Sequence, residues 1–289
     1  RSFLLQPVGE LETAVEPLFK AGRRLPVIGN AVGELLDLTL LFGQVKEGLD
    51  QLNLAHALQE GLFPTGCLSL GRLRVTGRSV MMEQVGGDFY DYFVDPHDEN
   101  HVYVCIGDVT GHGLAAAVVV AMISSAIPLV VRRPNQNPQE FLTTINQHLL
   151  PILKRLRMSS IMLMRIDSRS GDFFLAGAGH PALIHVKPDG GHEFIEMNAF
   201  PLGATKTLKI PGARMNIGEK RAIVFYTDGW VEAMTPDGEM IGYREFAEIA
   251  AKTVKSSDNP IEALYGKLEK LTGTTSWGDD VSIVLLEYD

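Results

Sequence analysis

Four short segments of this 289-residue chain place aspartate beside glycine at the end of an apolar run. The segments are Gly86-Gly87-Asp88, Gly107-Asp108-Val109, Thr227-Asp228-Gly229 and Gly278-Asp279-Asp280. A lone aspartate in such a place is usually a turn residue that hydrogen-bonds its own backbone. Four such segments in one domain instead predict carboxylates that converge at one edge of a sheet.

Carboxylates gathered in a site of low dielectric need a counter-charge, because each one raises the cost of ionising the others. Hard divalent cations such as Mg²⁺ and Mn²⁺ supply that charge and prefer oxygen ligands. Two such ions, about 3.5–4 Å apart, would bridge and deprotonate a water and polarise a phosphoryl oxygen. The residues alone therefore indicate a two-metal hydrolase, with phosphoester cleavage as its natural reaction.

The elements that must position these aspartates alternate between strand-like and helix-like patterns. Apolar runs predict strands over residues 72–82, 101–106, 160–166, 172–176, 182–186, 222–226 and 281–288. Helical periodicity predicts helices over residues 113–131, 138–157, 243–252 and 260–271. Strands in hairpin-like succession, with the helices in separate blocks, predict an α+β layered fold rather than a doubly wound parallel sheet.

Composition limits the classes of function. Hydrophobic residues make up 45%, charged residues 21%, and the formal net charge is −9. These values exclude wholesale disorder, a collagen-like fibre and a nucleic-acid binder that relies on general basicity. The chain has two cysteines, Cys67 and Cys105, and neither has a partner at metal-ligand spacing. This use of cysteine favours a reducing compartment. The uncharged stretch 114–131 is rich in alanine and contains two serines and a proline, which predicts a buried helix rather than a membrane span.

The first sixty residues follow a different pattern. Apolar residues recur at spacings of three and four over 8–18 and again over 35–52, with a short connector between them. So narrow an apolar stripe is typical of a helix that packs against other helices in a parallel coiled coil. Because one chain supplies too few helices for such a module, we expect a homodimer that supplies four.

This segment resembles a HAMP domain, the signalling linker of membrane receptors. The resemblance rests on Pro7 at the start of the first helix, the connector, and Gly33-Glu34-Leu35 at the start of the second helix. It implies dimerisation through residues 1–53 and a transmembrane sensor upstream of Arg1. The full-length protein would then be anchored at the cytoplasmic side of the inner membrane, while this chain itself is soluble. The alternative is a generic helical hairpin packed on the catalytic domain.

Over residues 54–289, the aspartate segments belong to a motif set that resembles the PPM-type metal-dependent protein phosphatases, in their bacterial SpoIIE/RsbU-like branch. The motifs are Gly86-Gly87-Asp88-Phe89-Tyr90-Asp91, Gly107-Asp108-Val109-Thr110-Gly111-His112-Gly113, Ala178-Gly179-His180-Pro181, Tyr226-Thr227-Asp228-Gly229 and Asp279-Asp280-Val281-Ser282. The resemblance implies a β-sandwich flanked by α-helices that hydrolyses phosphoserine or phosphothreonine in a protein. The implied domains are a HAMP-like module over 1–53, a linker helix over 54–64 and a phosphatase domain over 65–289.

The resemblance also implies roles for individual residues. Three aspartates are implied to be catalytic metal ligands: Asp88, Asp108 and Asp228. Asp108 would bridge two ions of Mn²⁺ or Mg²⁺, and the number of ions, two or three, stays open. The backbone carbonyl of Val109 would be a further ligand. One of the pair Asp279 and Asp280 would complete the second metal site, with Asp279 preferred. Attack by metal-bound hydroxide needs no serine or cysteine nucleophile.

The other polar residues of the motifs are not expected to be catalytic. Asp91 is expected to support the ligands indirectly or to cap a helix. Eukaryotic relatives have a histidine, proposed as general acid, where this chain has Thr110, and that role is not transferred to His112. No arginine near Asp88 matches their phosphate-binding arginine. His180 is expected to be a structural turn residue.

The sequence thus favours a Mn²⁺- or Mg²⁺-dependent serine/threonine protein phosphatase. By family analogy, its substrate is a phosphorylated anti-anti-sigma (STAS-type) regulator of a bacterial partner-switching pathway, and nucleic acid is not expected as a partner. The helix of residues 55–63, moved by the coiled coil, is expected to shape metal occupancy. Two alternatives stay open: a catalytically silent signalling module that keeps the fold and binds partners, and a metal-dependent hydrolase of a small phosphoester.

Overall fold

The computed structural model of this chain describes residues 46–132, 137–153 and 157–289. The chain divides into two compact units, Arg1–Ala55 and His56–Asp289. Residues 46–60 are helical. The predicted HAMP-like coiled coil lies almost entirely outside the described residues, so the module and the domain boundaries stay predictions. Among the helices that are described, none combines the length and the apolar character needed to cross a membrane.

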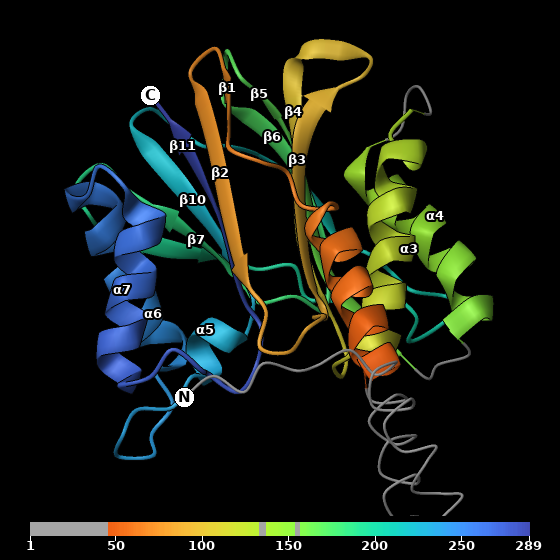
Figure 1. The fold of residues 1–289 in the computed structure, drawn as a ribbon. Helices are drawn as coiled ribbons and strands as arrows, with labels where there is room; N and C mark the ends of the chain where they lie inside the picture. Colours follow the sequence, from red (N-terminus) through yellow and green to blue (C-terminus); the bar gives the residue numbers. More distant parts are fainter. Residues whose placement is uncertain (1–45, 133–136, 154–156) are drawn as a thin grey trace, which may run out of the picture. The chain divides into compact units, whose positions relative to one another are not determined.

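Two antiparallel sheets form the centre of the second unit (Figure 1). The six-stranded sheet has the strand order β1-β2-β11-β10-β7-β8, and the five-stranded sheet has the order β3-β4-β5-β6-β9. The first sheet consists of β1 (Cys67–Leu70), β2 (Leu73–Val80), β7 (Leu183–Val186), β8 (His192–Ile195), β10 (Arg221–Tyr226) and β11 (Val281–Tyr288). The second consists of β3 (Asp88–Asp95), β4 (Asp98–Val109), β5 (Ser159–Asp167), β6 (Asp172–Ala178) and β9 (Gly212–Asn216).

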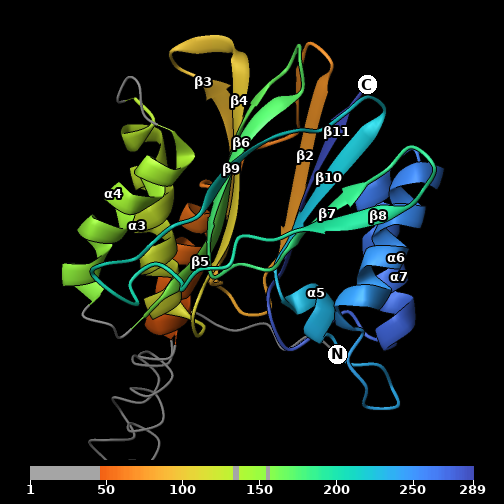
Figure 2. The ribbon, with the colours of Figure 1, turned by 180° about the vertical axis from the view of Figure 1, so that it is seen from behind.

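Helices cover the outer face of each sheet (Figures 1 and 2). The helices α3 (Leu114–Val130) and α4 (Pro138–Leu153) pack on the five-stranded sheet. The helices α5 (Gly229–Glu232), α6 (Gly242–Ser256) and α7 (Pro260–Thr272) pack on the six-stranded sheet. The prediction of an α+β sandwich flanked by helices is therefore confirmed.

The alternation of side chains along the strands produces three apolar layers. In β4, Val104 and Ile106 point into the core between the sheets, while Tyr103 and Cys105 pack beneath α3 and α4. Both faces of this strand are thus buried, which explains why its sequence is an unbroken apolar run rather than an alternating one. A third layer lies between the six-stranded sheet and its helices, around Trp230.

The sequence analysis missed several short elements: β1, β3, β8, β9 and α5. The most consequential is β3, because the sequence analysis treated the segment around Asp88 as a turn that follows a strand. The structure instead makes Asp88 the first residue of β3. Three aspartates within eight residues, Asp88, Asp91 and Asp95, interrupt the apolar pattern by which a strand is recognised. The helix α4 is described from Pro138 to Leu153, and Arg157, its predicted last residue, lies outside it.

Close packing between the sheets predicts opposite effects for two glycine substitutions. A methyl group on Gly77 of β2 would lie 2.4 Å from Cε2 of Tyr90, whereas one on Gly266 of α7 would meet no described atom within 4 Å. We expect Gly77→Ala to lower the free energy of unfolding by roughly 1–3 kcal/mol through overpacking. Gly266→Ala should raise it by roughly 0.5–1 kcal/mol through helix propensity. Urea unfolding checks both values, and equal stability of the two variants would contradict the packing described.

Candidate active site

Five aspartates from both sheets converge at one end of the sandwich. Asp88 opens β3, Asp108 is the penultimate residue of β4, and the two are direct cross-strand partners. Asp228 follows β10 and occupies the N-cap position of α5. Asp279 and Asp280 directly precede β11. All five predicted aspartates therefore meet, and they do so because strands of the two sheets begin or end at this edge.

Asp88 is buried, with 2% of its surface exposed. Its carboxylate accepts a hydrogen bond from Thr227 Oγ1 at 2.7 Å, and Thr227 Oγ1 accepts one from the backbone N–H of Ser282 at 3.0 Å. Burial raises the pKa of Asp88 well above its usual range, and the negative charges of Asp108 and Asp280 raise it further. The protein therefore holds this carboxylate where its charged form is disfavoured.

Asp108 has a larger number of acidic neighbours than the other four aspartates. Burial raises its pKa to about 7, with further contributions from the charges of Asp228, Asp279 and Asp280. Burial is also the main cause of the raised pKa values of Asp228 and Asp279. Asp108 thus lies within electrostatic reach of every segment of the cluster, which is the position that a bridging ligand would need.

Asp280 differs from Asp279 in what its oxygens contact. Its Oδ1 accepts the backbone N–H of Met82 at 2.8 Å, and its Oδ2 accepts that of Gly87 at 2.7 Å. The carboxylate of Asp280 therefore holds the loop that leads into Asp88. Asp279 accepts the N–H of Asp280 at 2.8 Å. This difference supports Asp279 as the metal ligand of the pair, an assignment that stays a prediction.

Two glycines allow the backbone to approach these groups closely. A methyl group on Gly86 would lie 2.2 Å from Oδ2 of Asp280, and one on Gly87 would lie 2.7 Å from the carbonyl oxygen of Val109. The N–H of Val109 also donates to the carbonyl of Gly87 at 3.0 Å. The Gly-Gly pair therefore places the predicted carbonyl ligand beside Asp88.

The chemistry of these donors fits a hard divalent cation. Across residues 46–132, 137–153 and 157–289, no three His, Cys, Asp or Glu side chains are already close enough to hold an ion. Binding would therefore require carboxylate side chains to rotate inward. Burial is the main cause of the raised pKa values of the cluster, and the repulsion between its carboxylates, which a divalent cation would offset, adds to it. The oxygen donors available to it are Asp88, Asp108, Val109, Asp228 and Asp279.

Of two further residues of the motifs, Asp91 lies apart from this cluster, whereas the charge of His112 acts on Asp279. Asp91 is in the middle of β3, three positions from Asp88 and so on the opposite face of the sheet. Burial raises its pKa to about 6, and its Oδ1 accepts the N–H of Tyr92. Of the two expectations for Asp91, a helix cap does not fit its place inside a strand, and an indirect role in supporting the ligands stays a prediction. His112 is exposed, and its Nδ1 lies 2.9 Å from Oε1 of Glu83.

Sequence reasoning missed Arg157. Its Nη1 donates a hydrogen bond to the carbonyl of Thr110, two residues beyond Asp108. The guanidinium lies over Gly111. The residues are far apart in the chain, and the antiparallel pairing of β4 with β5, which sets Val109 opposite Ser159, brings them together. No motif spacing in the sequence could have indicated this arginine.

Gln59 was also missed, although it connects the helix of residues 46–60 to the site. Its side chain is buried, its Nε2 donates to the carbonyl of Gly86 at 2.8 Å, and its Oε1 accepts the N–H of Gly86 at 3.0 Å. Nδ1 of His56, one turn earlier, lies 2.6 Å from the carbonyl of Gln84. The helix therefore contacts the loop that carries Asp88.

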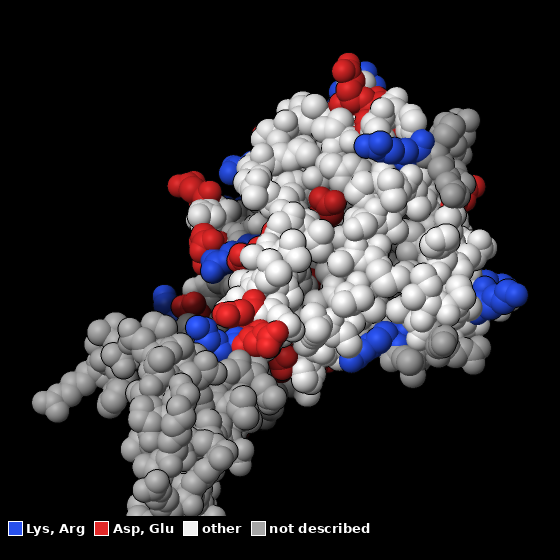
Figure 3. All heavy atoms as spheres, turned by 45° about the vertical axis from the view of Figure 1, so that its right-hand side comes forward, with Lys and Arg blue, Asp and Glu red and all other residues white. Residues whose placement is uncertain are grey.

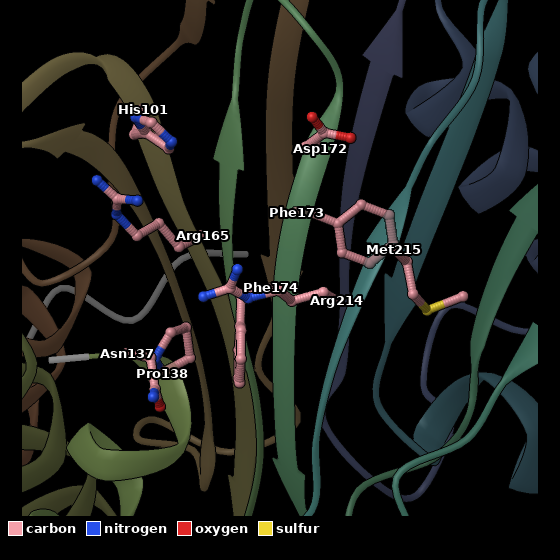
Figure 4. Close-up of a pocket in the computed structure, with 9 residues that line it drawn as sticks. All are labelled: His101, Asn137, Pro138, Arg165, Asp172, Phe173, Phe174, Arg214 and Met215. Carbon is pink, nitrogen blue, oxygen red and sulfur yellow. The ribbon is translucent and has the colours of Figure 1, made fainter.

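A cavity of about 680 Å³ lies elsewhere on the five-stranded sheet (Figure 4). His101, near the start of β4, and Arg165 line it, so it lies toward the opposite end of that strand from Asp108. Nε of Arg165 donates to the buried carboxylate of Asp95 at 2.6 Å, which offsets the charge of Arg165.

On the face in Figure 3, the coloured lysines and arginines form small groups rather than one continuous basic surface.

Comparison with known proteins agrees with this fold. The family profile described as Stage II sporulation protein E (SpoIIE) matches residues 98–289. Phosphoserine phosphatase RsbU of Bacillus subtilis is 23% identical over 246 residues, which cover 85% of this chain and 72% of RsbU. Phosphoserine phosphatase RsbP of the same organism is 23% identical over 152 residues, which cover 50% of this chain and 36% of RsbP.

Solved structures share the fold. The SiaA-PP2C domain of Pseudomonas aeruginosa superposes with a TM-score of 0.72 at 22% identity, covering 86% of this chain and 99% of that domain. The PP2C phosphatase domain of SpoIIE from Bacillus subtilis, solved with a fragment of its regulatory domain, gives a TM-score of 0.63 at 13% identity, covering 76% and 64%. Fold, site and relatives define a protein of the serine/threonine protein phosphatase class. Within that class, the chain belongs to the SpoIIE family.

The raised pKa of Asp108 predicts how the stability of the metal-free protein depends on pH. The folded state keeps a proton on Asp108 up to about pH 7, whereas the unfolded chain releases it near pH 4. The folded state binds more protons between these values, so the free energy of unfolding should fall as the pH rises through this window. In urea unfolding with EDTA present, the free energy of unfolding of Asp108→Asn should fall less over this window than that of the parent protein. The exposed Asp258→Asn serves as the control and should show the same fall as the parent. An equal fall in all three proteins would contradict the assignment.

Proposed function

We propose that this chain is a Mn²⁺- or Mg²⁺-dependent phosphoprotein phosphatase that hydrolyses phosphoserine or phosphothreonine. The observation that carries the proposal is the direct pairing of Asp88 with Asp108 across β3 and β4. Like charges placed directly opposite each other in a sheet are destabilising. An arrangement that buries them together, and adds the charges of Asp228 and Asp279, is suited to a bound cation rather than to stability alone.

Each part of the site has a distinct role in this proposal. The aspartates and the carbonyl of Val109 would hold the ions, which when bound would activate a water for attack and polarise the phosphoryl group. Thr227 fixes one oxygen of Asp88, and Asp280 fixes the loop before it. Arg157 places a guanidinium beside the loop after Asp108, where its remaining N–H groups can bind a phosphate oxygen.

The proposed substrate is a phosphorylated STAS-type regulatory protein of a partner-switching pathway. The relatives RsbU and RsbP are both named phosphoserine phosphatases, which supports phosphoserine as the group that is hydrolysed. The HAMP resemblance supports a homodimer that forms through residues 1–53 and is controlled by an upstream transmembrane sensor. The chain described here would then lie at the cytoplasmic side of the inner membrane. These parts of the proposal rest on the sequence.

The helix that contains Gln59 is proposed to regulate metal occupancy. Gln59 makes two hydrogen bonds to Gly86, and the next residue, Gly87, donates to Asp280. A shift of the helix along its axis would therefore move the loop that positions Asp88. Leu58 is 67% exposed, so the contact to the loop belongs to Gln59 rather than to the apolar side of the helix.

The catalytic proposal predicts Mn²⁺-dependent hydrolysis of p-nitrophenyl phosphate and of a phosphoserine protein. Asp108→Asn should lower kcat/KM for both by roughly 10²-fold or more, because it removes a charged ligand shared by the two metal sites. The exposed Asp237→Asn serves as the matched control and should leave both rates unchanged. A parent protein that folds but shows no metal-dependent hydrolysis of either compound would support the silent signalling module instead.

The regulatory proposal predicts a metal-specific defect in Gln59→Leu. The Mn²⁺ concentration for half-maximal activity should rise by roughly tenfold, the effect typical of losing a group that orients metal ligands. Gln51→Leu makes the same chemical change at an exposed position of the same helix and should leave it unchanged. If Gln59→Leu lowers kcat at saturating Mn²⁺ without changing the Mn²⁺ requirement, the helix does not act through metal occupancy.

A further inference from the structure

Two methionines lie side by side on a short hairpin that follows the aspartate cluster. Met234 and Met240 pair with each other in an isolated antiparallel bridge between α5 and α6. Met234 is 46% exposed and Met240 is 62% exposed. Single exposed apolar residues are common, but two that are direct cross-strand partners form one continuous apolar surface, which calls for an explanation.

The fold of the hairpin directs both methionines outward. The N–H of Ile241 donates to the carbonyl of Ala233 at 3.1 Å, and a hydrogen-bonded turn closes the hairpin. Ala233 and Ile241 are buried in the layer between the six-stranded sheet and its helices. Because successive side chains of an extended segment point to opposite sides, the burial of these two residues turns Met234 and Met240 away from the core.

The hairpin is attached to the element that carries Asp228. Asp228 is the N-cap residue of α5, and Met234 follows the end of that helix by two residues. Four helical residues advance the chain by about 6 Å and two extended ones by about 7 Å, so Cα of Met234 lies within about 13 Å of Cα of Asp228. Trp230 of α5 is buried, and its Nε1 donates to the carbonyl of Ser282 at 2.9 Å, which fixes α5 to β11.

The other end of the hairpin also lies near Asp228. Tyr243, three residues after Met240, is the second residue of α6. Burial raises the pKa of Tyr243, and the negative charges of Asp228 and Glu232 raise it further, so its hydroxyl is within electrostatic reach of Asp228. In Figure 1 the segment between α5 and α6 projects from the same end of the sandwich as α5. Both ends of the hairpin thus adjoin the aspartate cluster.

Charge and reach together indicate what this surface contacts. Residues 232–245 contain four acidic side chains and one basic one, namely Glu232, Asp237, Glu239, Glu245 and Arg244. This balance disfavours an anionic membrane or a nucleic acid. A protein chain whose phosphoserine enters the aspartate cluster would pass the hairpin within three to four residues, since four extended residues span about 13 Å. Methionine side chains are flexible and polarizable, which suits contact with apolar side chains of different shapes.

We propose that the exposed pair of Met234 and Met240 is a docking surface for the protein substrate, where an apolar side chain close to the phosphoserine packs against both thioethers. The two methionines are thereby positioning residues for the substrate, and a small phosphoester is too short to reach them. The inference rests on the phosphatase function proposed above, because that function brings the phosphoserine to the aspartates.

The test compares short phosphoserine peptides that have either leucine or serine at the third position on each side of the phosphoserine, with Mn²⁺ present and p-nitrophenyl phosphate as the small substrate. The parent protein should prefer the leucine peptide by roughly fivefold in kcat/KM, mainly through KM, the discrimination that partial burial of a leucine provides. The double variant Met234→Gln, Met240→Gln keeps the length of both side chains but not their apolar character. It should reduce the ratio toward one.

Three controls separate docking from a general defect. The double variant Met234→Leu, Met240→Leu keeps the surface apolar and should retain the leucine preference. Met215→Gln makes the change to glutamine at an exposed methionine of β9 and should also retain it. Asp237→Asn alters the turn of the hairpin beyond the paired methionines, and the preference should again be retained.

The outcomes distinguish the docking surface from the catalytic function. Hydrolysis without a leucine preference, or a preference that survives the double glutamine variant, would overturn the docking surface alone. Equal losses on both peptides and p-nitrophenyl phosphate would also overturn it, because the hairpin would then only support the aspartates. A parent dimer that the double glutamine variant converts to a monomer in light scattering would overturn the substrate role, because a second copy of this chain would then cover the pair. No Mn²⁺-dependent hydrolysis of p-nitrophenyl phosphate would overturn the phosphatase function and the docking surface with it.

Discussion

Asp88, which is buried, and Asp108, which is half-buried, face each other across β3 and β4, and their ionised forms repel each other. Ordinary sheets avoid such a pair, because like charges directly opposite are destabilising and burial removes the water that would screen them. Much of the surrounding structure maintains this pairing. The glycines at 86 and 87 admit neighbouring backbone and side-chain oxygens at distances that a Cβ would forbid. The site is therefore a place where the fold accepts a local cost in stability.

The two sheets share the work of holding the cluster. The five-stranded sheet supplies Asp88 and Asp108, while the segments beside β10 and β11 in the six-stranded sheet supply Thr227 and Asp280, which bond to Asp88 and to the loop before it. The core between the sheets thus sets the spacing of the carboxylates as well as the stability of the domain. A disturbance of that core should reach the site even when it leaves every aspartate in place.

The sequence allowed most of the sandwich and all five aspartates of the cluster to be predicted, because apolar strand patterns and Gly-Asp segments are local signals. It did not reveal β3, whose aspartates break the apolar pattern, and it left open a helix cap for Asp91 that the place of this residue inside β3 excludes. Arg157 and Gln59 were missed for a different reason. Their contacts depend on strand pairing and helix docking between residues far apart in the chain, and no spacing in the sequence records such contacts.

His180 connects the loop between the two sheets to the strand beside Asp108. Its Nδ1 side is used by Ser160, which in turn accepts the backbone N–H of Asp108, and this agrees with the expectation of a structural residue. Burial lowers the pKa of His180 to about 3, opposed by a backbone hydrogen bond with Tyr226, so the ring adds no positive charge near the aspartates. One edge of the fold thus concentrates negative charge that a bound cation would offset.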